Sequence, residues 1–409
     1  MLRTVFSFFG VVLFLNINAQ LKNGWYRAII TRPDSVSIVF NAEAVLQNKK
    51  TVLYIRNAAE RLKVDNIKLK GDSVFIEMPF FESSFKLKKL SNHSLKGVWL
   101  KGASNRIIEM PVLFEYSNKS RFVAGDSLNE NLDGKWQVVF TRSNGTDRPA
   151  VAVFEQNGKM VTGTFLTPTG DYRYLEGTLN KNTLQLSCFD GSHAYYFSAE
   201  VNDNVISNGK FYSTVSAPEL WKAVKKNNAS LPDTLQQTQL KEGETKLNFR
   251  FKDVNGKTVS INDAQFKNKV VIIQLMGSWC PNCMDESNFL KLVYKDYKAK
   301  GLEIVAIAYE LTTDEARSKV SLQKFINRFS IVYPVLIAPA AVNDEQRTEK
   351  TLPQLTPIRS FPTTIFIGKD GTVQKVHSGF YGPGTGVYYE EFKKEFFEVV
   401  NSLLSKEVH

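Results

Sequence analysis

Two of the three cysteines in the chain, Cys280 and Cys283, lie close together in the sequence GSWCPNC at residues 277–283. Such a pair can be a redox-active dithiol, half of a zinc site or two ordinary buried residues. On one face of a helix, residues i and i+3 are about 5–6 Å apart, which is the Cα separation that a disulfide prefers. The pair can therefore form and break a disulfide without rearrangement of the backbone.

The zinc alternative requires a second group of ligands. The chain has four histidines, and none of them forms a second cluster with Cys or Asp at ligand spacing: His93, His193, His377 and His409. We therefore expect no metal and no cofactor. The third cysteine, Cys188, alternates with Leu184 and Leu186 in TLQLSCFDG, which predicts a buried and unreactive thiol.

The elements around the pair explain how it could react. Residues 270–275, VVIIQL, form a continuous apolar run that predicts a buried strand, and a helical pattern follows from Pro281 to about Lys300. Gly301 then stands where a C-cap glycine is preferred. This order places Cys280 at a helix N-terminus, where free N–H groups and the positive end of the helix dipole stabilise a thiolate. We expect Cys280 to be the exposed nucleophile and Cys283 the more buried resolving thiol.

Further strands and helices complete this part of the chain. Apolar runs predict strands at 302–309 and 333–338, and residues 363–380 predict a hairpin that turns at 369–371. Amphipathic patterns predict helices at 313–329 and 388–405. Strands that alternate with helices indicate an α/β domain around a mixed sheet.

Residues 246–409 resemble the thioredoxin superfamily, in particular its exported TlpA/ResA-like branch of disulfide reductases. The resemblance rests on LNFRFKDVNGKTVSINDAQFKNKVVIIQLMGSWCPNC and on SFPTTIFIGKDGTV. It implies a thioredoxin fold and a thiol–disulfide oxidoreductase with a Cys280–Cys283 redox disulfide. It also implies a cis bond at Pro362 facing the dithiol, which leaves the Phe361 backbone free to pair with an extended substrate. Trp279, Phe361 and Pro362 are thus the candidate substrate-binding residues.

Glu286 is the third candidate catalytic residue beside the two cysteines. It follows Cys283 by one helical turn, and the ResA-like pattern carries a functional glutamate there, which suggests that it relays the proton of the resolving thiol. The alternative is a solvated acid that the helix dipole favours. Two departures matter: Gln274 replaces the buried acid of thioredoxin, and the Pro281-Asn282 dipeptide leaves the direction of electron flow open.

The first half of the chain follows a different pattern. Short alternating runs predict antiparallel β structure in two copies at an offset near 110 residues, since GWYRAIITRPDSVSIVF resembles GKWQVVFTRSNGTDRPAVAVF. We assign the copies to residues 20–120 and 130–226, and residues 227–245 to a linker. About eight strands in the second copy suffice for a small barrel that holds a ligand or only side chains. The fold class is a multidomain α+β protein: a duplicated, barrel-like β region followed by a thioredoxin fold.

Residues 1–19 read as a secretory signal peptide. Arg3 precedes an apolar run at residues 5–15, and Ala19 suits cleavage. The run is shorter than the roughly 20 residues that cross a bilayer, so an uncleaved anchor is the weaker alternative. Three cysteines in 409 residues cannot form a disulfide framework, so a close pair in an exported protein favours redox chemistry. We expect a periplasmic or otherwise exported protein.

The expected function is that of an exported thiol:disulfide oxidoreductase that reduces or reshuffles disulfides of other exported proteins. The resemblance implies a membrane thiol reductant as the electron donor, with membrane contact only through partners. The net charge of +11 is spread singly and predicts no nucleic-acid binding. One alternative is a ligand- or partner-binding barrel, with an accessory thioredoxin-like domain and aromatics such as Tyr195, Tyr196 and Phe197 in a pocket. The other is a dithiol oxidase or isomerase.

Overall fold

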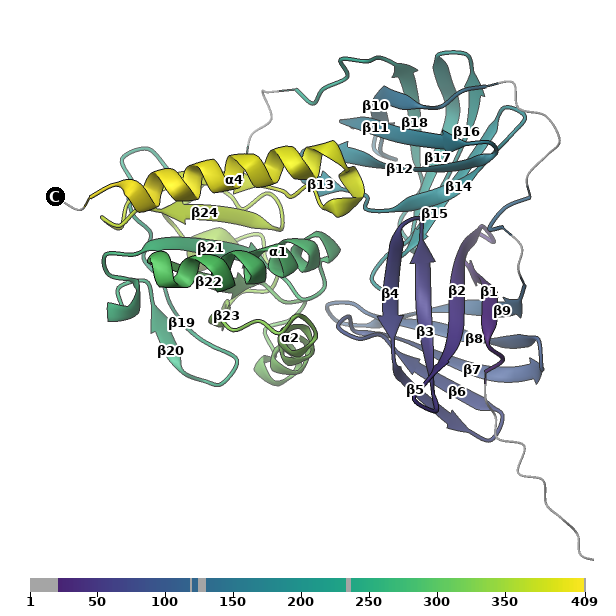
Figure 1. The fold of residues 1–409 in the computed structure, drawn as a ribbon, viewed down its shortest axis with the longest axis horizontal. Helices are drawn as coiled ribbons and strands as arrows, with labels where there is room; N and C mark the ends of the chain where they lie inside the picture. The colour runs from purple at the N-terminus through teal and green to yellow at the C-terminus, as the bar shows by residue number, and fades with distance from the viewer. Residues whose placement is uncertain (1–20, 118–119, 124–129, 233–236, 408–409) are drawn as a thin grey trace, which may run out of the picture.

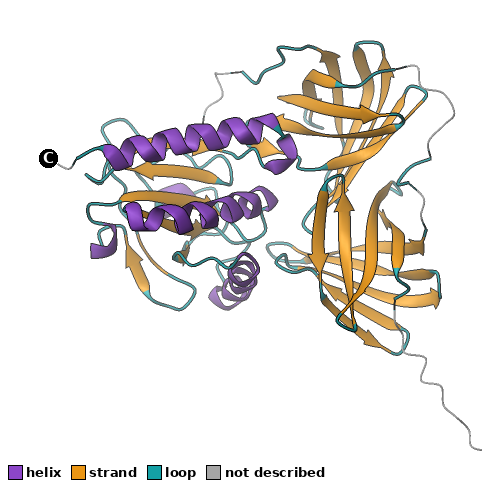
Figure 2. Ribbon diagram, in the orientation of Figure 1, coloured by secondary structure: helices purple, strands orange, loops and turns teal. Residues whose placement is uncertain are grey.

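The computed structural model describes residues 21–117, 120–123, 130–232 and 237–407, so the expected signal peptide at 1–19 lies outside the described residues. Two antiparallel β units and one α/β domain make up the described chain (Figures 1 and 2). The second β unit, in teal, stacks on the first, in purple and blue, and the green and yellow α/β domain lies beside both.

The first β unit is an open nine-stranded sheet in the order β4-β3-β2-β1-β9-β8-β7-β6-β5. Its strands are β1 (Gly24–Thr31), β2 (Ser37–Gln47), β3 (Lys50–Asn57), β4 (Glu60–Val64), β5 (Asn66–Lys70), β6 (Ser73–Glu77), β7 (Ser83–Ser91), β8 (Ser94–Gly102) and β9 (Ile107–Tyr116). Alternation along the strands buries one face, as Tyr26, Ala28 and Ile30 show in β1. The sheet curls, but its two edge strands do not pair, so the barrel stays open.

The second β unit is also nine-stranded, in the order β11-β10-β18-β17-β16-β15-β14-β12-β13, and an extra β11–β12 pairing closes it into a barrel. Its strands are β10 (Gly134–Thr141), β11 (Asp147–Asn157), β12 (Met160–Thr167), β13 (Gly170–Asp171), β14 (Leu175–Asn180), β15 (Thr183–Phe189), β16 (Ala194–Asn202), β17 (Val205–Ser213) and β18 (Glu219–Lys225). These two units confirm the expected β-rich region.

Aromatic side chains fill the interior of the closed barrel. Phe197 stacks on Phe211 with ring centroids 4.3 Å apart, and the two lie in one buried cluster with Phe140, Phe165 and Trp221. Tyr196 points to the other side of the sheet and stacks on Tyr212. The alternating aromatics at 195–197 therefore contribute mainly to packing.

The α/β domain has a five-stranded mixed sheet in the order β23-β22-β21-β24-β25, with β21, β22 and β23 parallel. Its strands are β21 (Val270–Met276), β22 (Leu302–Ala308), β23 (Val335–Ile337), β24 (Thr363–Ile367) and β25 (Val373–Ser378), and a separate hairpin pairs β19 (Arg250–Lys252) with β20 (Thr258–Ser260). The helices are α1 (Pro281–Tyr297), α2 (Glu315–Phe329), α3 (Arg347–Thr351) and α4 (Val387–Ser405), with short 3-10 turns η1 (Ala264–Phe266), η2 (Lys298–Lys300) and η3 (Pro383–Thr385). The expected mixed α/β sheet is confirmed.

The two faces of this sheet bury different partners because β21 is apolar on both faces. Ile272 packs in one core cluster with residues of α1, α2 and α4, whereas Ile273 packs in another with residues 247–266 and 352–358. Residues 238–241, within the expected linker 227–245, are also attached to this domain, since the Lys241 backbone N–H donates to the Gln354 carbonyl at 2.8 Å. The assignment of the whole segment 227–245 as a linker stays a prediction.

Candidate active site

Cys280 and Cys283 form a disulfide with a Cα–Cα distance of 5.2 Å. β21 ends at Met276, and Cys280 is the N-cap residue of α1, with Pro281 in the first turn. The backbone N–H of Cys283 donates to Cys280 Sγ at 3.2 Å. The sulfur of Cys280 thus lies where the free N–H groups of the helix stabilise negative charge, as the sequence predicts.

The proline loop closes the other side of the disulfide. The Phe361–Pro362 peptide bond is cis, and the Phe361 carbonyl oxygen lies 3.5 Å from Cys280 Sγ. The Trp279 ring meets the Phe361 ring edge-on with centroids 5.8 Å apart, and Trp279 Nε1 donates to the Tyr309 carbonyl at 2.8 Å. The structure therefore brings together the residues that the sequence separates by about 80 positions.

Cys280 is only 4% exposed, so the expectation of an exposed nucleophile is wrong for this arrangement. Loops of the second β unit cover the site. Ser192 Oγ donates to the Trp279 carbonyl at 2.9 Å, and Asn282 Nδ2 donates to the Asp171 carbonyl at 3.2 Å. The sequence has no local signal for this cover because its residues lie more than 80 positions away along the chain.

Glu286 is 1% exposed, which excludes the solvated-acid alternative. Its carboxylate accepts hydrogen bonds from Gln274 Nε2 at 2.7 Å and from Thr364 Oγ1. Burial raises the pKa of Glu286 to about 7, and the bonds from Thr364 and Gln274 offset part of that rise. Gln274 therefore does not remove the buried acid from the site; it orients one that α1 supplies.

Two other carboxylates near the disulfide, the buried Glu310 and the partly buried Asp285, were not anticipated. Glu310 accepts from Ser278 N at 2.8 Å and from Ser278 Oγ at 2.6 Å, and burial raises its pKa to about 7. Asp285 forms an ion pair with Arg173 of the barrel, and burial raises the pKa of Asp285 to about 7 although Arg173 opposes that rise. Their partners come from distant elements, so sequence spacing could not single them out.

Other chemistry has little support in the described part of the chain. There, no group of three or more His, Cys, Asp or Glu side chains is arranged to hold a metal ion. Cys188 is fully buried, and burial raises the pKa of its thiol well above the ordinary range. Among the described residues, no helix is both long enough and apolar enough to cross a bilayer.

Comparisons with known proteins show which family and which relatives the sequence resembles. The Redoxin family model matches residues 241–385. The thiol-disulfide oxidoreductase ResA of Halalkalibacterium halodurans is 28% identical over 160 residues, which cover 39% of this chain and 76% of that protein. ResA of Bacillus subtilis is 29% identical over 140 residues, covering 34% of this chain and 69% of that protein.

Solved structures that align with part of the chain are also thiol–disulfide proteins by name. A putative thiol:disulfide interchange protein DsbE from Chlorobium tepidum aligns at 21% identity and a TM-score of 0.30, covering 40% of this chain and 99% of that one. A putative protein disulfide isomerase from Bacteroides thetaiotaomicron aligns at 20% identity and a TM-score of 0.31, covering 42% and 94%. We refer to the α/β domain as the Redoxin domain because its residues 241–385 match the Redoxin family model. The chain is similar to the ResA thiol-disulfide oxidoreductases, and the protein is an oxidoreductase.

Proposed function

We propose that the protein is an exported thiol:disulfide oxidoreductase that reduces or reshuffles disulfides in other exported proteins. The observation that carries the proposal is the Cys280–Cys283 disulfide at the N-terminus of α1, against the cis-Pro362 loop. Its relatives named ResA are thiol-disulfide oxidoreductases. Residues 1–19 support export through their signal-like sequence, and the resemblance to the TlpA/ResA branch supports a membrane thiol reductant as electron donor.

The reaction needs the reduced form of the pair. The Cys280 thiolate, stabilised by the Cys283 N–H and the helix dipole, attacks one sulfur of a substrate disulfide. The substrate S–S bond breaks, a mixed disulfide forms on Cys280, and the other substrate sulfur leaves as a thiolate. The Cys283 thiolate then attacks Cys280 Sγ, which restores the Cys280–Cys283 disulfide and releases the second substrate thiol. Two electrons pass to the substrate, and a dithiol reductant returns them to the pair.

Glu286 is the proposed proton acceptor for Cys283. It lies one helical turn beyond Cys283 on the same face of α1, and it is buried among uncharged partners. A carboxyl group with a pKa of about 7 can both take and return a proton near neutral pH. Trp279, Phe361 and Pro362 are proposed to contact the substrate, because they surround Cys280 Sγ.

Reduction is the direction that we propose, on the basis of the ResA resemblance. Oxidation or isomerisation would use the same residues, and the redox potential of the pair distinguishes these directions. The alternative function, a barrel that binds a ligand in its interior, has less support, because aromatic side chains fill that interior. Its loops instead lie against the dithiol site.

Single-turnover exchange with 2-hydroxyethyl disulfide tests the proposal. The full-length chain is reduced, freed of excess reductant and mixed with this small, uncharged disulfide. We expect wild type to reduce about one equivalent of the disulfide per chain and so to release about two equivalents of 2-mercaptoethanol, whereas Cys280→Ser shows no release above buffer, because the attacking thiolate is gone. Cys188→Ser is the matched control and should react like wild type, since that thiol is buried. Release by Cys280→Ser at the wild-type rate would refute the proposed nucleophile.

A further inference from the structure

The second β unit lies directly on the face of the Redoxin domain that carries the dithiol. A Cβ atom on Gly379, in the loop after β25, would lie 3.0 Å from the Thr169 carbonyl carbon and 3.1 Å from the Gly170 backbone nitrogen. A Cβ atom on Gly170 would lie 2.3 Å from Asn282 Nδ2, between the two cysteines. Main chain therefore meets main chain at Gly379, and at Gly170 the Asn282 side chain takes the space that a Cβ atom would need.

A buried charged cluster holds this contact together. The Arg173 side chain, 4% exposed, forms ion pairs with Asp285 of α1 and with Glu60 of the first β unit. Arg173 Nη1 also donates to the Pro281 carbonyl at 3.2 Å. One guanidinium thus links both β units to the first turn of the dithiol helix.

The neighbouring Asp171 adds a second fixed point. Its side chain accepts from the Gly382 backbone N–H at 2.7 Å, and its carbonyl accepts from Asn282. On the other side, Ser192 holds the Trp279 carbonyl. These hydrogen bonds fix the dithiol segment at Trp279, before Cys280, and at Asn282, after it.

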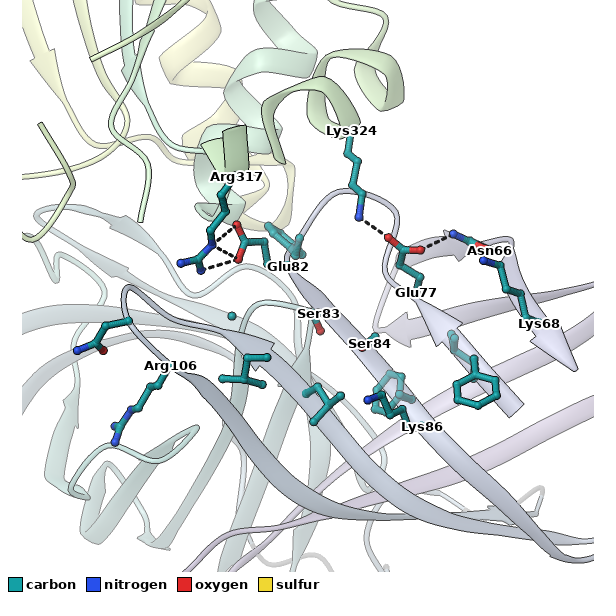
Figure 3. A pocket seen from close by; sticks show the side chains of 18 residues that line it. Asn66, Lys68, Glu77, Glu82, Ser83, Ser84, Lys86, Arg106, Arg317 and Lys324 are labelled. Carbon is teal, nitrogen blue, oxygen red and sulfur yellow. Dashed lines mark hydrogen bonds and ion pairs between the residues drawn. The ribbon is translucent and has the colours of Figure 1, made fainter. Parts of the chain in front are cut away.

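The first β unit contacts the Redoxin domain through Phe80, whose ring lies 5.2 Å from that of Phe329, and through two ion pairs. Figure 3 shows the groove between β6, β7 and α2, where Arg317 pairs with Glu82 at 2.6 Å and Lys324 pairs with Glu77. Both pairs are roughly a third exposed, and exposed ion pairs contribute little to the stability of a contact. The buried Arg173 cluster is therefore the stronger determinant of the closed arrangement, since removal of one partner leaves a buried charge unpaired.

The cavity next to Trp279 is small, and neither cysteine is among the residues that line it. A cavity of about 70 Å³ lies between Trp279, Ser278, Ser192 and Phe81. That volume admits a few waters or part of a small molecule, since one water occupies about 30 Å³ of the liquid. A folded or extended polypeptide does not fit while the barrel loops stay in place.

We propose that the β-barrel gates the dithiol by substrate size, with Arg173 as the positioning residue that keeps the gate closed. In the closed arrangement a polypeptide disulfide cannot reach Cys280, and exchange with protein substrates proceeds from an arrangement in which loops 168–173 and 190–193 have left the site. This gate rests on the proposed exchange reaction and adds control of access to it. Reactivity toward a bulky substrate then scales with the fraction of chains that are open.

The test compares one large and one small disulfide. Pre-reduced full-length chain reacts in single turnover with insulin or with 2-hydroxyethyl disulfide, and the ratio of the two rate constants is recorded. Arg173→Met should raise the insulin-to-small ratio about tenfold, because it increases the open fraction. Arg173→Lys should restore part of the wild-type ratio, because it keeps a cation between the carboxylates.

Arg148→Met is the matched control, since the partners of Arg148, Tyr172 and Glu219, both belong to the barrel. Its ratio should stay at the wild-type value. If circular dichroism shows that Arg173→Met does not fold, the rate ratio of Ser192→Ala is measured instead. That change removes a single hydrogen bond to Trp279 and should raise the ratio about threefold.

The outcomes separate the gate from the reaction itself. A wild-type ratio in every folded variant of Arg173 and in Ser192→Ala would overturn the gate, even if exchange with the small disulfide is normal. Loss of the small-disulfide reaction in wild type would instead refute the proposed function. An equal rise in Arg148→Met would also overturn the gate, because it would show that general loosening of the barrel changes the ratio.

Discussion

The second turn of α1 carries two consecutive acids that face different parts of the molecule. Asp285 points toward the barrel and pairs with Arg173, whereas Glu286 points into the Redoxin core and accepts only from uncharged Gln274 and Thr364. Burial raises the pKa of each to about 7. The two carboxyl groups therefore have similar acidities for different structural reasons.

The difference lies in what surrounds each group. Around Asp285 stand Arg173 and the further acids Glu60, Asp171 and Asp190, so its charge takes part in a network that joins domains. Around Glu286 there is no such network, so its proton can move without disturbing a domain contact. A buried acid with a guanidinium partner suits docking, and one with amide and hydroxyl partners suits proton transfer.

The largest effect is expected from Glu286→Gln. The change removes the proton acceptor but keeps the shape, and we expect the rate of small-disulfide exchange above pH 7 to fall about 100-fold, at the low end for general acid–base catalysis. In wild type the rate should rise with pH through about 7, as Glu286 loses its proton, and the variant should lack that rise. A pH series of single-turnover rates measures both. An unchanged profile in the variant would show that Glu286 has only a structural role.

A smaller effect on chemistry and a clear effect on stability are expected from Asp285→Asn. The change leaves Arg173 with Glu60 as its remaining ion-pair partner, so we expect a loss of about 1–3 kcal/mol in the free energy of unfolding. The rate with 2-hydroxyethyl disulfide should change less than about threefold, since Asp285 takes no part in the proton relay. Urea unfolding and the exchange assay check the two parts. If Asp285→Asn lost as much exchange rate as Glu286→Gln, the assignment of different roles to the two acids would be wrong.

The smallest effect is expected in the pH dependence of stability. Both carboxyl groups bind their proton more tightly in the folded chain than in the unfolded one, because burial raises each pKa from near 4 to about 7. The stability that each contributes is thus complete below about pH 4 and declines as the pH rises through 7. Asp285→Asn and Glu286→Gln should each flatten the decline in urea-derived stability between pH 5 and 8. If the free energy of unfolding declined with pH as steeply in both variants as in wild type, burial would not raise the pKa of these two carboxyl groups as we infer.

The Redoxin domain could be predicted well from the sequence because its signals are local. The run at 270–275 is apolar at most positions, as a strand buried on both faces requires, and Pro281 and Gly301 mark the ends of the helical segment. The position of Cys280 at the helix N-terminus follows from that order. Glu286 could be singled out by spacing, whereas its burial depends on Thr364, which follows by 78 positions.

The β units show what the sequence pattern did not distinguish. Both copies predict the same strands, yet only the second closes. At the closure β12 pairs with both β11 and β14, and a Cβ atom on Gly163 would lie 2.2 Å from the Val153 carbonyl oxygen. The first copy has Leu53 at the corresponding position and remains open. The cover over Cys280 was missed for a related reason, since Arg173, Asp171 and Ser192 of the barrel reach the dithiol segment only in the folded chain.

The central claim is that Cys280 and Cys283 form a reversible redox couple. The full-length chain can be equilibrated in dithiothreitol buffers of stepped potential, trapped with an alkylating reagent and analysed by peptide mass. We expect Cys280 and Cys283 to gain label together in one two-electron transition, with Cys188 unlabelled, and a midpoint near the value of about −270 mV for thioredoxin. A midpoint near the value of about −120 mV for a strong oxidant would contradict reduction, and labelling of only one of the two cysteines would contradict the couple itself.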